Sequence, residues 1–398
     1  MTETLRSQRF SFVSLVTLTY GVRRSLARSS VRVQLGVLRC CGFLRPARPS
    51  APHAAYRALT LALTAVYLAQ ECAYAYQERA DMEKLTRVMF LLLCHVTSLA
   101  KQLVFFADAD RIDRMIDGLD APLYNRRGRA ALRAAARRAA RLARGYPAAA
   151  AATCALWAVL PALAHARGGA VEFPFWLGLD RSSRFWLALL YSYYVTTLVG
   201  VANTTMDAFI ATVLNQYKTQ LRILRCSLEQ VPAARPGEPR ERALHRELRA
   251  CLAHYSLICQ NVKTLQDIFG WAILVQFGIG GWILCMAAYQ LVSLSVLSIE
   301  FASMTLFICC ILTELFLYCF YGNEVAVESG RVVQSAYCMR WERCGPRVRR
   351  SLLVLMERAR RPLAPAAGRV VPLSLDTFLK VRGHLVLVSS ELQLNVFF

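Results

Sequence analysis

The run FASMTLFICCILTELFLYCFY, residues 301–321, decides the fold class of this chain of 398 residues. Glu314 is the one charged residue that interrupts it. About twenty mostly apolar residues are enough for an α-helix to cross the hydrocarbon core of a bilayer. The run therefore predicts a membrane-spanning helix.

Further runs of the same kind recur along the chain. The overall apolar content is 56%, above the roughly 45–50% that is usual for soluble domains, and the excess is collected into these runs. A closing segment, 372–390, is a weaker seventh, because Lys380, Arg382 and His384 interrupt it. We expect an all-α, seven-transmembrane protein whose other spans cover residues 57–76, 86–106, 146–166, 185–211 and 268–294.

The distribution of Lys and Arg predicts the orientation. Residues 1–56 hold nine of them, and the connections 107–145, 212–267 and 322–371 hold ten, nine and ten. The alternate connections 77–85, 167–184 and 295–300 hold two, three and none. Because positive residues collect on the cytoplasmic side, we expect a cytoplasmic N-terminus and an extracellular C-terminus. This topology is inverted relative to a G-protein-coupled receptor, and it explains the net charge of +22 without a nucleic-acid partner.

The cytoplasmic segments have helical character. Residues 127–145 predict a basic helix beside anionic membrane lipid, and 241–269 predict an amphipathic helix that runs into the fifth span. No signal peptide opens the chain. The N-terminal residues fit either an amphipathic arm on the membrane surface or a disordered terminus.

The sequence lacks every catalytic and metal-binding motif that we sought. It has no phosphate-binding glycine loop, no His-Glu-x-x-His and no Gly-x-Ser-x-Gly, and its six histidines are scattered. We therefore expect no enzyme, no cofactor and no metal. The fourteen cysteines lie mostly inside apolar runs, where thiols act as small hydrophobic groups, so no disulfide framework is predicted.

Charged residues inside spans are candidates for function. Arg57 and Lys101 lie near cytoplasmic ends, where long side chains snorkel to the surface. Glu71 lies deeper, and is expected either to face a polar pocket or to pair with Gln70 and its neighbours. Asp207 and Glu314 are expected to pair between helices or to contact a cytoplasmic helix.

Aromatic side chains in the outer halves of the spans are the other candidates. Apolar pockets for small ligands are lined by such side chains, with a few polar groups that orient the guest. The same residue types also form interfacial belts and ordinary helix contacts. With Glu71, the pocket candidates are Tyr67, Phe90, Trp157, Tyr191, Tyr194, Trp282, Tyr289 and Phe307.

The stretch LFLYCFYGNEVAVESGRVVQSAYCMRWERC, residues 315–344, resembles the insect odorant receptor family. The resemblance rests on the spacing of Gly322, Glu328-Ser329, Ala336-Tyr337 and Trp341, and it covers roughly 185–380. Downstream, Ser374 and Phe378 match the entry to the family's last span. Upstream, Asp207 and His254 match positions of the helix that leaves the fourth span and of the cytoplasmic helix before the fifth.

The resemblance implies a function that the residues alone do not give. Members of this family are ligand-gated, nonselective cation channels of the plasma membrane of olfactory sensory neurons. The resemblance implies a tetramer of a ligand-tuned subunit with a shared odorant receptor co-receptor. It also implies a small volatile odorant bound among spans two to six, cytoplasmic helices that form an anchor with Trp341 and His254, and a pore lined by the last span.

Alternatives stay open at this stage. A gustatory-type receptor of the same superfamily, a transporter and a non-conducting membrane protein are the rival classes. We divide the chain into a cytoplasmic arm (1–56), a transmembrane domain (57–380) and an atypical tail (381–398). The tail departs from the family pattern at Val381, so it is either a pore segment with unusual charges or not the authentic end of the last span. A receptor that is non-functional because of the altered last span is a further alternative.

Overall fold

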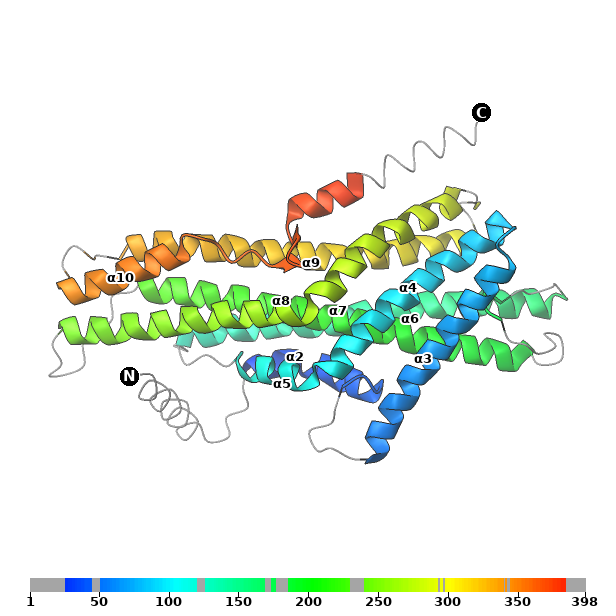
Figure 1. Cartoon of the computed structure of the whole chain (residues 1–398), viewed down its shortest axis with the longest axis horizontal. Coiled ribbons are helices and arrows are strands. Elements are labelled where there is room, and N and C mark those ends of the chain that lie inside the picture. The colour runs from blue at the N-terminus through cyan, green and yellow to red at the C-terminus, as the bar shows by residue number, and fades with distance from the viewer. Residues whose placement is uncertain are drawn as a thin grey trace.

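The computed structural model describes most of the chain as long helices (Figure 1). The described residues are 26–44, 51–119, 126–168, 173–176, 185–229, 240–292, 294–295, 298–339, 341 and 344–383. The helices are α2 (Leu26–Cys40), α3 (Ala51–Gln77), α4 (Met82–Ala107), α5 (Ala109–Asp117), α6 (Arg126–Ala166), α7 (Phe185–Glu229), α8 (Arg240–Val292), α9 (Ile299–Tyr337) and α10 (Pro346–Ala359).

Within the described residues, six helices are long and apolar enough to cross a membrane: α3, α4, α6, α7, α8 and α9. Five of them contain a stronger predicted span in full, and α8 contains residues 268–292 of the predicted span 268–294, so the six long apolar helices are confirmed. Of the weaker seventh, residues 375–383 are helical. Residues 372–374 are not, because Pro372 belongs to a short strand, and residues 384–390 lie outside the described residues. The seventh span therefore stays a prediction.

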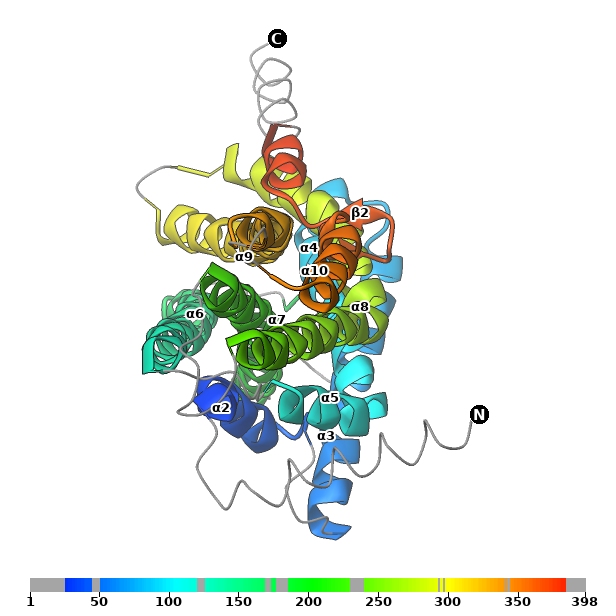
Figure 2. The same ribbon diagram turned by 90° about the vertical axis from the view of Figure 1, so that its left-hand side faces the viewer.

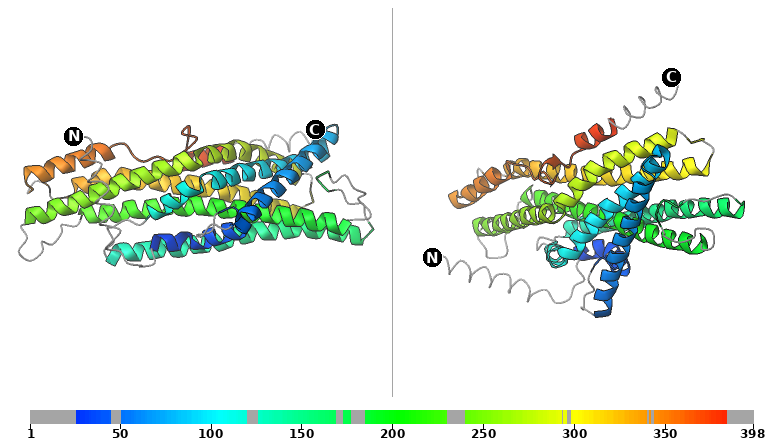
Figure 3. Two further views of the ribbon diagram at one scale, coloured as in Figure 1. Left: turned by 60° about the horizontal axis from the view of Figure 1, so that its bottom comes forward. Right: turned by 45° about the vertical axis from the view of Figure 1, so that its right-hand side comes forward.

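Helix α7 is the centre of the bundle. Seen end-on, it lies among α2, α6, α8 and α9 (Figure 2). Nearly every residue from Thr204 to Leu221 is buried, on all sides of the helix. Helix α3 crosses the others obliquely at the edge of the bundle (Figure 3), and its contacts are mainly with α4.

Three of the spanning helices continue far beyond their apolar stretches. The 45 residues of α7 correspond to about 67 Å of helix, roughly twice the thickness of the hydrocarbon core. Residues 212–229 of α7, 240–267 of α8 and 322–337 of α9 gather with α10 at one end of the molecule, at the left of Figure 1. We call this part the extended end. The predicted amphipathic helix before the fifth span is confirmed as the first half of α8.

Helix α6 joins two segments that the sequence analysis treated separately. The basic stretch 127–145 and the span 146–166 form one helix of 41 residues, although Pro147 and Pro161 lie inside it. Proline removes one backbone donor and usually kinks a helix rather than ending a long one. The basic segment is thus a continuation of the third span.

A small hairpin precedes the last helical segment. Strand β1 (Ala366–Ala367) pairs antiparallel with β2 (Val371–Pro372). Gly368 and Arg369 both have positive φ, which is typical of the tight turns that match strand twist. The Gly368 N–H donates to the Gly270 carbonyl at 2.7 Å, so the hairpin docks on α8.

Candidate functional site

Three aromatic rings from three helices meet inside the bundle. Phe90 of α4, Trp157 of α6 and Phe307 of α9 have ring centroids 5.4–5.6 Å apart. The Trp157 Nε1–H donates to Ser303 Oγ at 2.6 Å, which fixes the indole. All three are predicted pocket residues, and the structure brings them together.

A cavity of about 90 Å³ lies beside these rings, between α4, α6, α7 and α9. Trp157 and Phe307 line it, and Phe90 packs behind them. Most of the wall is apolar, with a few polar groups, as is typical of small-ligand sites. The other lining residues are Leu91, Cys94, His95, Ser98, Tyr146, Ala150, Thr153, Cys154, Thr196, Val199, Gly200, Asn203, Thr204, Cys310, Ile311 and Glu314.

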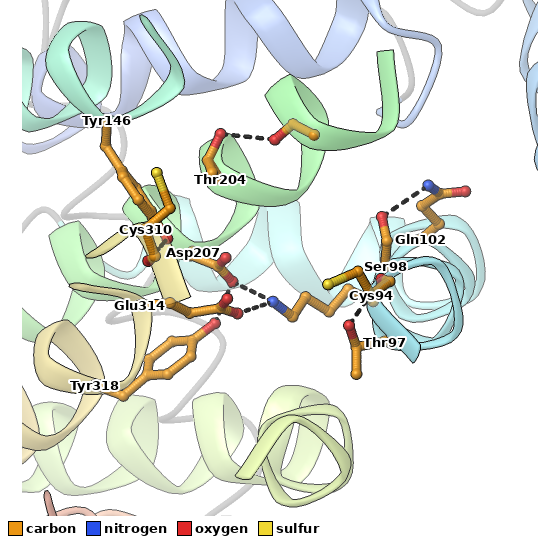
Figure 4. A network of polar contacts seen from close by, with 12 residues as sticks. Cys94, Thr97, Ser98, Gln102, Tyr146, Thr204, Asp207, Cys310, Glu314 and Tyr318 are labelled. Atoms are coloured by element: carbon orange, nitrogen blue, oxygen red, sulfur yellow. Dashed lines mark hydrogen bonds and ion pairs between the residues drawn. The ribbon is translucent and has the colours of Figure 1, made fainter. Parts of the chain in front are cut away.

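A buried ion network lies at one end of the cavity (Figure 4). Lys101 Nζ donates to Asp207 Oδ1 at 2.6 Å and to Glu314 Oε1, and the Tyr318 hydroxyl donates to Asp207 Oδ1 at 2.5 Å. The three charged side chains are at most 1% exposed. We call Lys101, Asp207, Glu314 and Tyr318 the floor; Glu314 lines the cavity, and the other three lie behind it.

The floor corrects one prediction and confirms another. Lys101 does not snorkel to the membrane surface, because two carboxylates inside the bundle hold its ammonium group. Burying a charge is tolerated when an opposite charge pairs with it. Asp207 and Glu314 pair between helices through Lys101, as expected. Arg57, the other residue expected to snorkel, is buried and stacks over the Phe106 ring at 4.6 Å.

A hydrogen-bonded histidine–carboxylate pair lies next to the cavity. His95 lines the cavity and its Nδ1 lies 2.8 and 2.9 Å from the two carboxylate oxygens of Glu71. The Tyr67 ring packs edge-on against His95, 5.3 Å between centroids. Tyr191 packs against Tyr67 and donates to Gln70 Oε1 at 2.9 Å. Tyr67, Glu71 and Tyr191 thus support the cavity through His95 rather than lining it.

The remaining pocket candidates lie elsewhere. Tyr194, Trp282 and Tyr289 are 50%, 64% and 44% exposed and are not among the lining residues. Their positions on α7 and α8 suit contact with lipid or with another subunit. Of the predicted pocket residues, Trp157 and Phe307 line the cavity. The residues packed behind this wall are Phe90, Tyr67, Glu71 and Tyr191.

Two of the family-motif residues connect α9 with the segments next to it. Glu328 accepts from Arg225 Nη1 of α7 at 2.6 Å. The Ser329 hydroxyl oxygen accepts from the Leu363 N–H at 2.8 Å and so holds the loop after α10. Both side chains are buried, in accord with a structural role at the extended end.

Gly322 permits a close approach between α9 and the start of the last segment. A Cβ at this position would lie 2.5 Å from Leu373 Cβ and 2.6 Å from the Leu373 carbonyl oxygen. Ser374 then caps the following helix by accepting from the Thr377 N–H at 3.2 Å. The Phe378 ring packs against Phe316 of α9, 5.4 Å between centroids.

His254, Tyr337 and Trp341 differ in their surroundings. His254 of α8 is 1% exposed, and burial lowers its pKa to about 4. Neither ring nitrogen has a hydrogen-bond partner among the described residues. Trp341 packs against the core, whereas Tyr337 is 63% exposed. An exposed aromatic ring at the extended end suits contact with another chain.

Sequence reasoning missed His95, Asn203 and the many small lining residues. A signal was present on α4, where Leu91, His95 and Ser98 recur at the helical spacing that leads to Lys101. Among the described residues, no group of three or more His, Cys, Asp or Glu is arranged to hold a metal ion.

Known proteins resemble the chain over most of its length. A family model described as 7tm Odorant receptor matches residues 81–383. Odorant receptor 94a of Drosophila melanogaster is 26% identical over 199 residues, 50% of each chain. Odorant receptor Or2 of Anopheles gambiae is 28% identical over 138 residues, 35% of this chain and 36% of that one. The chain thus spans at most about half the length of these curated relatives.

A solved structure has the same fold. The insect olfactory receptor OR5 from Machilis hrabei, in complex with eugenol, superposes with a TM-score of 0.79 and covers 91% of this chain and 97% of its own. A second structure of the same receptor, for which no ligand is named, gives the same TM-score. The sequence identity is 16%, so the likeness establishes the fold.

Proposed function

The chain belongs to the 7tm odorant receptor family, and from this premise we propose that it binds small, volatile, apolar odorants within its membrane helices and opens a nonselective cation channel. The carrying observation is the mostly apolar cavity between α4, α6, α7 and α9, lined by Trp157 and Phe307. The eugenol complex of the Machilis receptor supports a ligand site in this fold. The function is that of a receptor and not of an enzyme.

We further propose the assembly and its setting. The chain acts as the ligand-tuned subunit of a heterotetramer with the odorant receptor co-receptor, in the plasma membrane of olfactory sensory neurons. The exposed Tyr337 and the length of α7, α8 and α9 support an inter-subunit role for the extended end. The Lys and Arg distribution supports a cytoplasmic position for that end and for residues 1–56, and an extracellular C-terminus.

Co-expression with the co-receptor tests the function. Cells that carry both chains should give an inward cation current to some member of a volatile panel, and cells with the co-receptor alone should not. The absence of current with every volatile, despite detection of the chain at the cell surface, would contradict the proposal. An epitope tag at the N-terminus should be stained only after permeabilisation, and staining of intact cells would contradict the orientation.

A non-functional receptor is the second candidate. It is favoured by Arg382 and His384, which fall where a pore-lining helix is expected. Under this proposal the transmembrane domain is residues 57–380, and residues 381–398 form an altered end of the last span. Transcript sequencing across the codon of Val381 tests this candidate. One continuous message that encodes residues 372–398 as the major form would support it, and a different major sequence after Lys380 would contradict it.

A further inference from the structure

One side of helix α6 carries a row of exposed arginines. They recur at spacings of four, four and three residues, so they lie on the same side of the helix. Seen end-on, α6 lies at the outside of the bundle (Figure 2). The row therefore faces the surroundings of the protein and not its core. Its members are Arg133, Arg137, Arg141 and Arg144, and all of them are exposed.

The positive charge of this row is not neutralised within the described part of the chain. Helix α6 contains no Asp or Glu in its 41 residues. Among the described residues, none of the four arginines forms an ion pair. Glu324 of the neighbouring helix α9 is already paired with Lys218. The row thus keeps its charge for a partner from outside the chain.

The depth of the row follows from the contacts between α6 and α9. The Tyr146 hydroxyl donates to the Cys310 carbonyl at 3.0 Å, and Cys310 lies in the middle of the span 301–321. Leu142 packs on the same small cluster as Tyr321, the last residue of that span. The last arginines of the row therefore flank the end of the apolar run of α9 instead of lying far beyond it.

The direction of the side chains gathers these arginines at one level. Side chains of an α-helix lean toward its N-terminus, which for α6 is the end at which the extended end lies. Long basic side chains reach the headgroups of a membrane from such positions. Arg137, Arg141 and Arg144 cover about 10 Å of helix axis. Their guanidinium groups are thus within reach of a single headgroup.

The same side of α6 becomes apolar directly after the arginines. Ala148 and Ala152 continue the row at spacings of four residues and are exposed, and Val159 beyond them is 46% exposed. Methyl side chains leave a smooth surface on which an acyl chain can lie. This side of the helix is basic toward the extended end and apolar within the span, which is the arrangement that a phospholipid of the inner leaflet requires.

We propose that this side of α6 binds an anionic phospholipid whose headgroup carries more than one phosphate, with the phosphates on Arg137, Arg141 and Arg144 and an acyl chain along Ala148 and Ala152. Guanidinium groups pair with phosphate oxygens in a bidentate manner. An acidic segment of another protein matches the charge but not the depth or the apolar continuation. The inference rests on the proposed function in one respect, the cytoplasmic position of the extended end.

Displacement of a fluorescent, short-chain phosphatidylinositol bisphosphate from the purified full-length chain tests the ligand class. Anisotropy in a nonionic detergent follows the release of this probe. Unlabelled dioctanoyl phosphatidylinositol bisphosphate should displace it at a concentration at least about tenfold lower than dioctanoyl phosphatidylserine, which carries a single phosphate. Free inositol trisphosphate lacks the acyl chains and should also need at least about tenfold more. Equal displacement by dioctanoyl phosphatidylcholine or by the free trisphosphate would overturn the proposal.

A triple variant of α6 assigns the binding to named residues. Arg137→Gln, Arg141→Gln and Arg144→Gln together should weaken binding at least about twentyfold, because each arginine near an anionic headgroup contributes about fivefold. Glutamine is nearly as good a helix former as arginine, so α6 keeps its structure. Unchanged lipid binding in this variant, together with loss of co-purification with the co-receptor, would assign the surface to a protein partner and overturn the proposal.

A triple variant of α10 is the matched control. Arg347→Gln, Arg349→Gln and Arg350→Gln remove the same charge from three exposed arginines of the extended end, which have no apolar span beside them. Binding should stay within about twofold of the unchanged chain, since separated surface charges are screened by salt. Equal losses in the two triple variants would show attraction by the overall charge and would overturn the proposal.

Failure of this inference can be told apart from failure of the proposed function. Odorant-evoked current in a chain without the lipid preference would leave the receptor function standing and remove the inference. Lipid-selective binding without any current in co-expressing cells would support the inference while the receptor function fails. Staining of an N-terminal tag on intact cells would place the row at the outer leaflet and overturn the inference.

Discussion

Lys101 and His254 are both buried and titratable. Removing a charge from water costs free energy, and the two side chains differ in how this cost is met. Lys101 keeps its charge because Asp207 and Glu314 hold the ammonium group from two other helices. His254 has no hydrogen-bond partner among the described residues, so burial lowers its pKa to about 4 and it stays neutral. Each solution leads to a test at the scale of one residue.

Lys101→Met should destabilise the bundle far more than Glu314→Gln. The first change leaves two carboxylates buried without their cation, which typically costs about 3–5 kcal/mol. The second leaves the Lys101–Asp207 pair intact. Thermal unfolding of the purified proteins in detergent measures the difference, and equal midpoints for the two variants would contradict the assigned role of the floor.

The stability of the chain should fall as the pH drops from about 6.5 toward 4 because of His254. The ordinary pKa of histidine is 6.5, and in the folded chain the pKa is about 4. Between these values the unfolded chain binds a proton that the folded chain does not, so unfolding is favoured as pH falls. The effect is at most about 3 kcal/mol.

His254→Phe should remove this component of the pH dependence. Thermal midpoints recorded between pH 7 and pH 4 give the slope for the variant and for the unchanged chain. Identical slopes would contradict the description of His254 as a buried neutral imidazole.

The surroundings of single side chains were harder to predict from the sequence than the helices. Trp157 and Phe307 were predicted for the pocket by their type and depth, and they do line the cavity. Tyr194 and Trp282 have the same type and depth but are exposed. Which side of a long apolar helix faces the bundle depends on the partner helices, and hydropathy alone does not give it.

At the scale of elements, α9 connects the cavity to the last segment. Along one face of this helix lie Phe307, Glu314, Tyr318 and Gly322, at spacings of seven, four and four residues. The face passes from the cavity wall through the floor to Leu373. We therefore expect a displacement of α9 at the cavity to reach the start of the last helical segment through the Gly322–Leu373 contact.

Gly322→Ala should uncouple ligand binding from current. The added Cβ would lie 2.5 Å from Leu373 Cβ, and overpacking of this kind forces the neighbouring backbone to shift. We expect a maximal odorant-evoked current lowered at least about fivefold, with binding to the purified chain unchanged. Gly281→Ala on α8, where an added Cβ meets nothing within 4 Å, is the matched control. Normal current in Gly322→Ala would rule out this role.

The elements themselves followed closely from the sequence. The six stronger spans were predictable because long apolar runs have few alternatives in a membrane protein. Helix α3, which contains the first predicted span, begins at Ala51 rather than at residue 57, since helix propensity continues beyond the apolar stretch. The hairpin β1–β2 was not predicted, because two short pairs of residues leave no periodicity to recognise.

At the scale of the molecule, three zones lie along the bundle: an aromatic cavity, an ionic floor and an extended end built from α7, α8, α9 and α10. The sequence predicted the extended end through the lengths and charges of its connections. It predicted interhelical pairing for Asp207 and Glu314 but not that Lys101 holds both, because the three residues are distant in the chain and meet only after α4, α7 and α9 have packed.

Occupation of the cavity by a volatile ligand is the central claim for the whole molecule. Gly200 lines the cavity, and an added Cβ there meets Cys154 Sγ at 3.4 Å, an ordinary contact. Gly200→Leu therefore fills the cavity with the least disturbance of its wall. Gly281→Leu adds the same side chain on α8 away from the cavity.

Odorant-evoked cation current in cells that co-express the chain and the co-receptor tests this claim most directly. Gly200→Leu should raise the half-maximal odorant concentration at least about tenfold or abolish the current, with surface expression preserved, while Gly281→Leu behaves as the unchanged chain. An unchanged odorant response in Gly200→Leu would contradict the account, because the ligand would then bind somewhere other than this cavity.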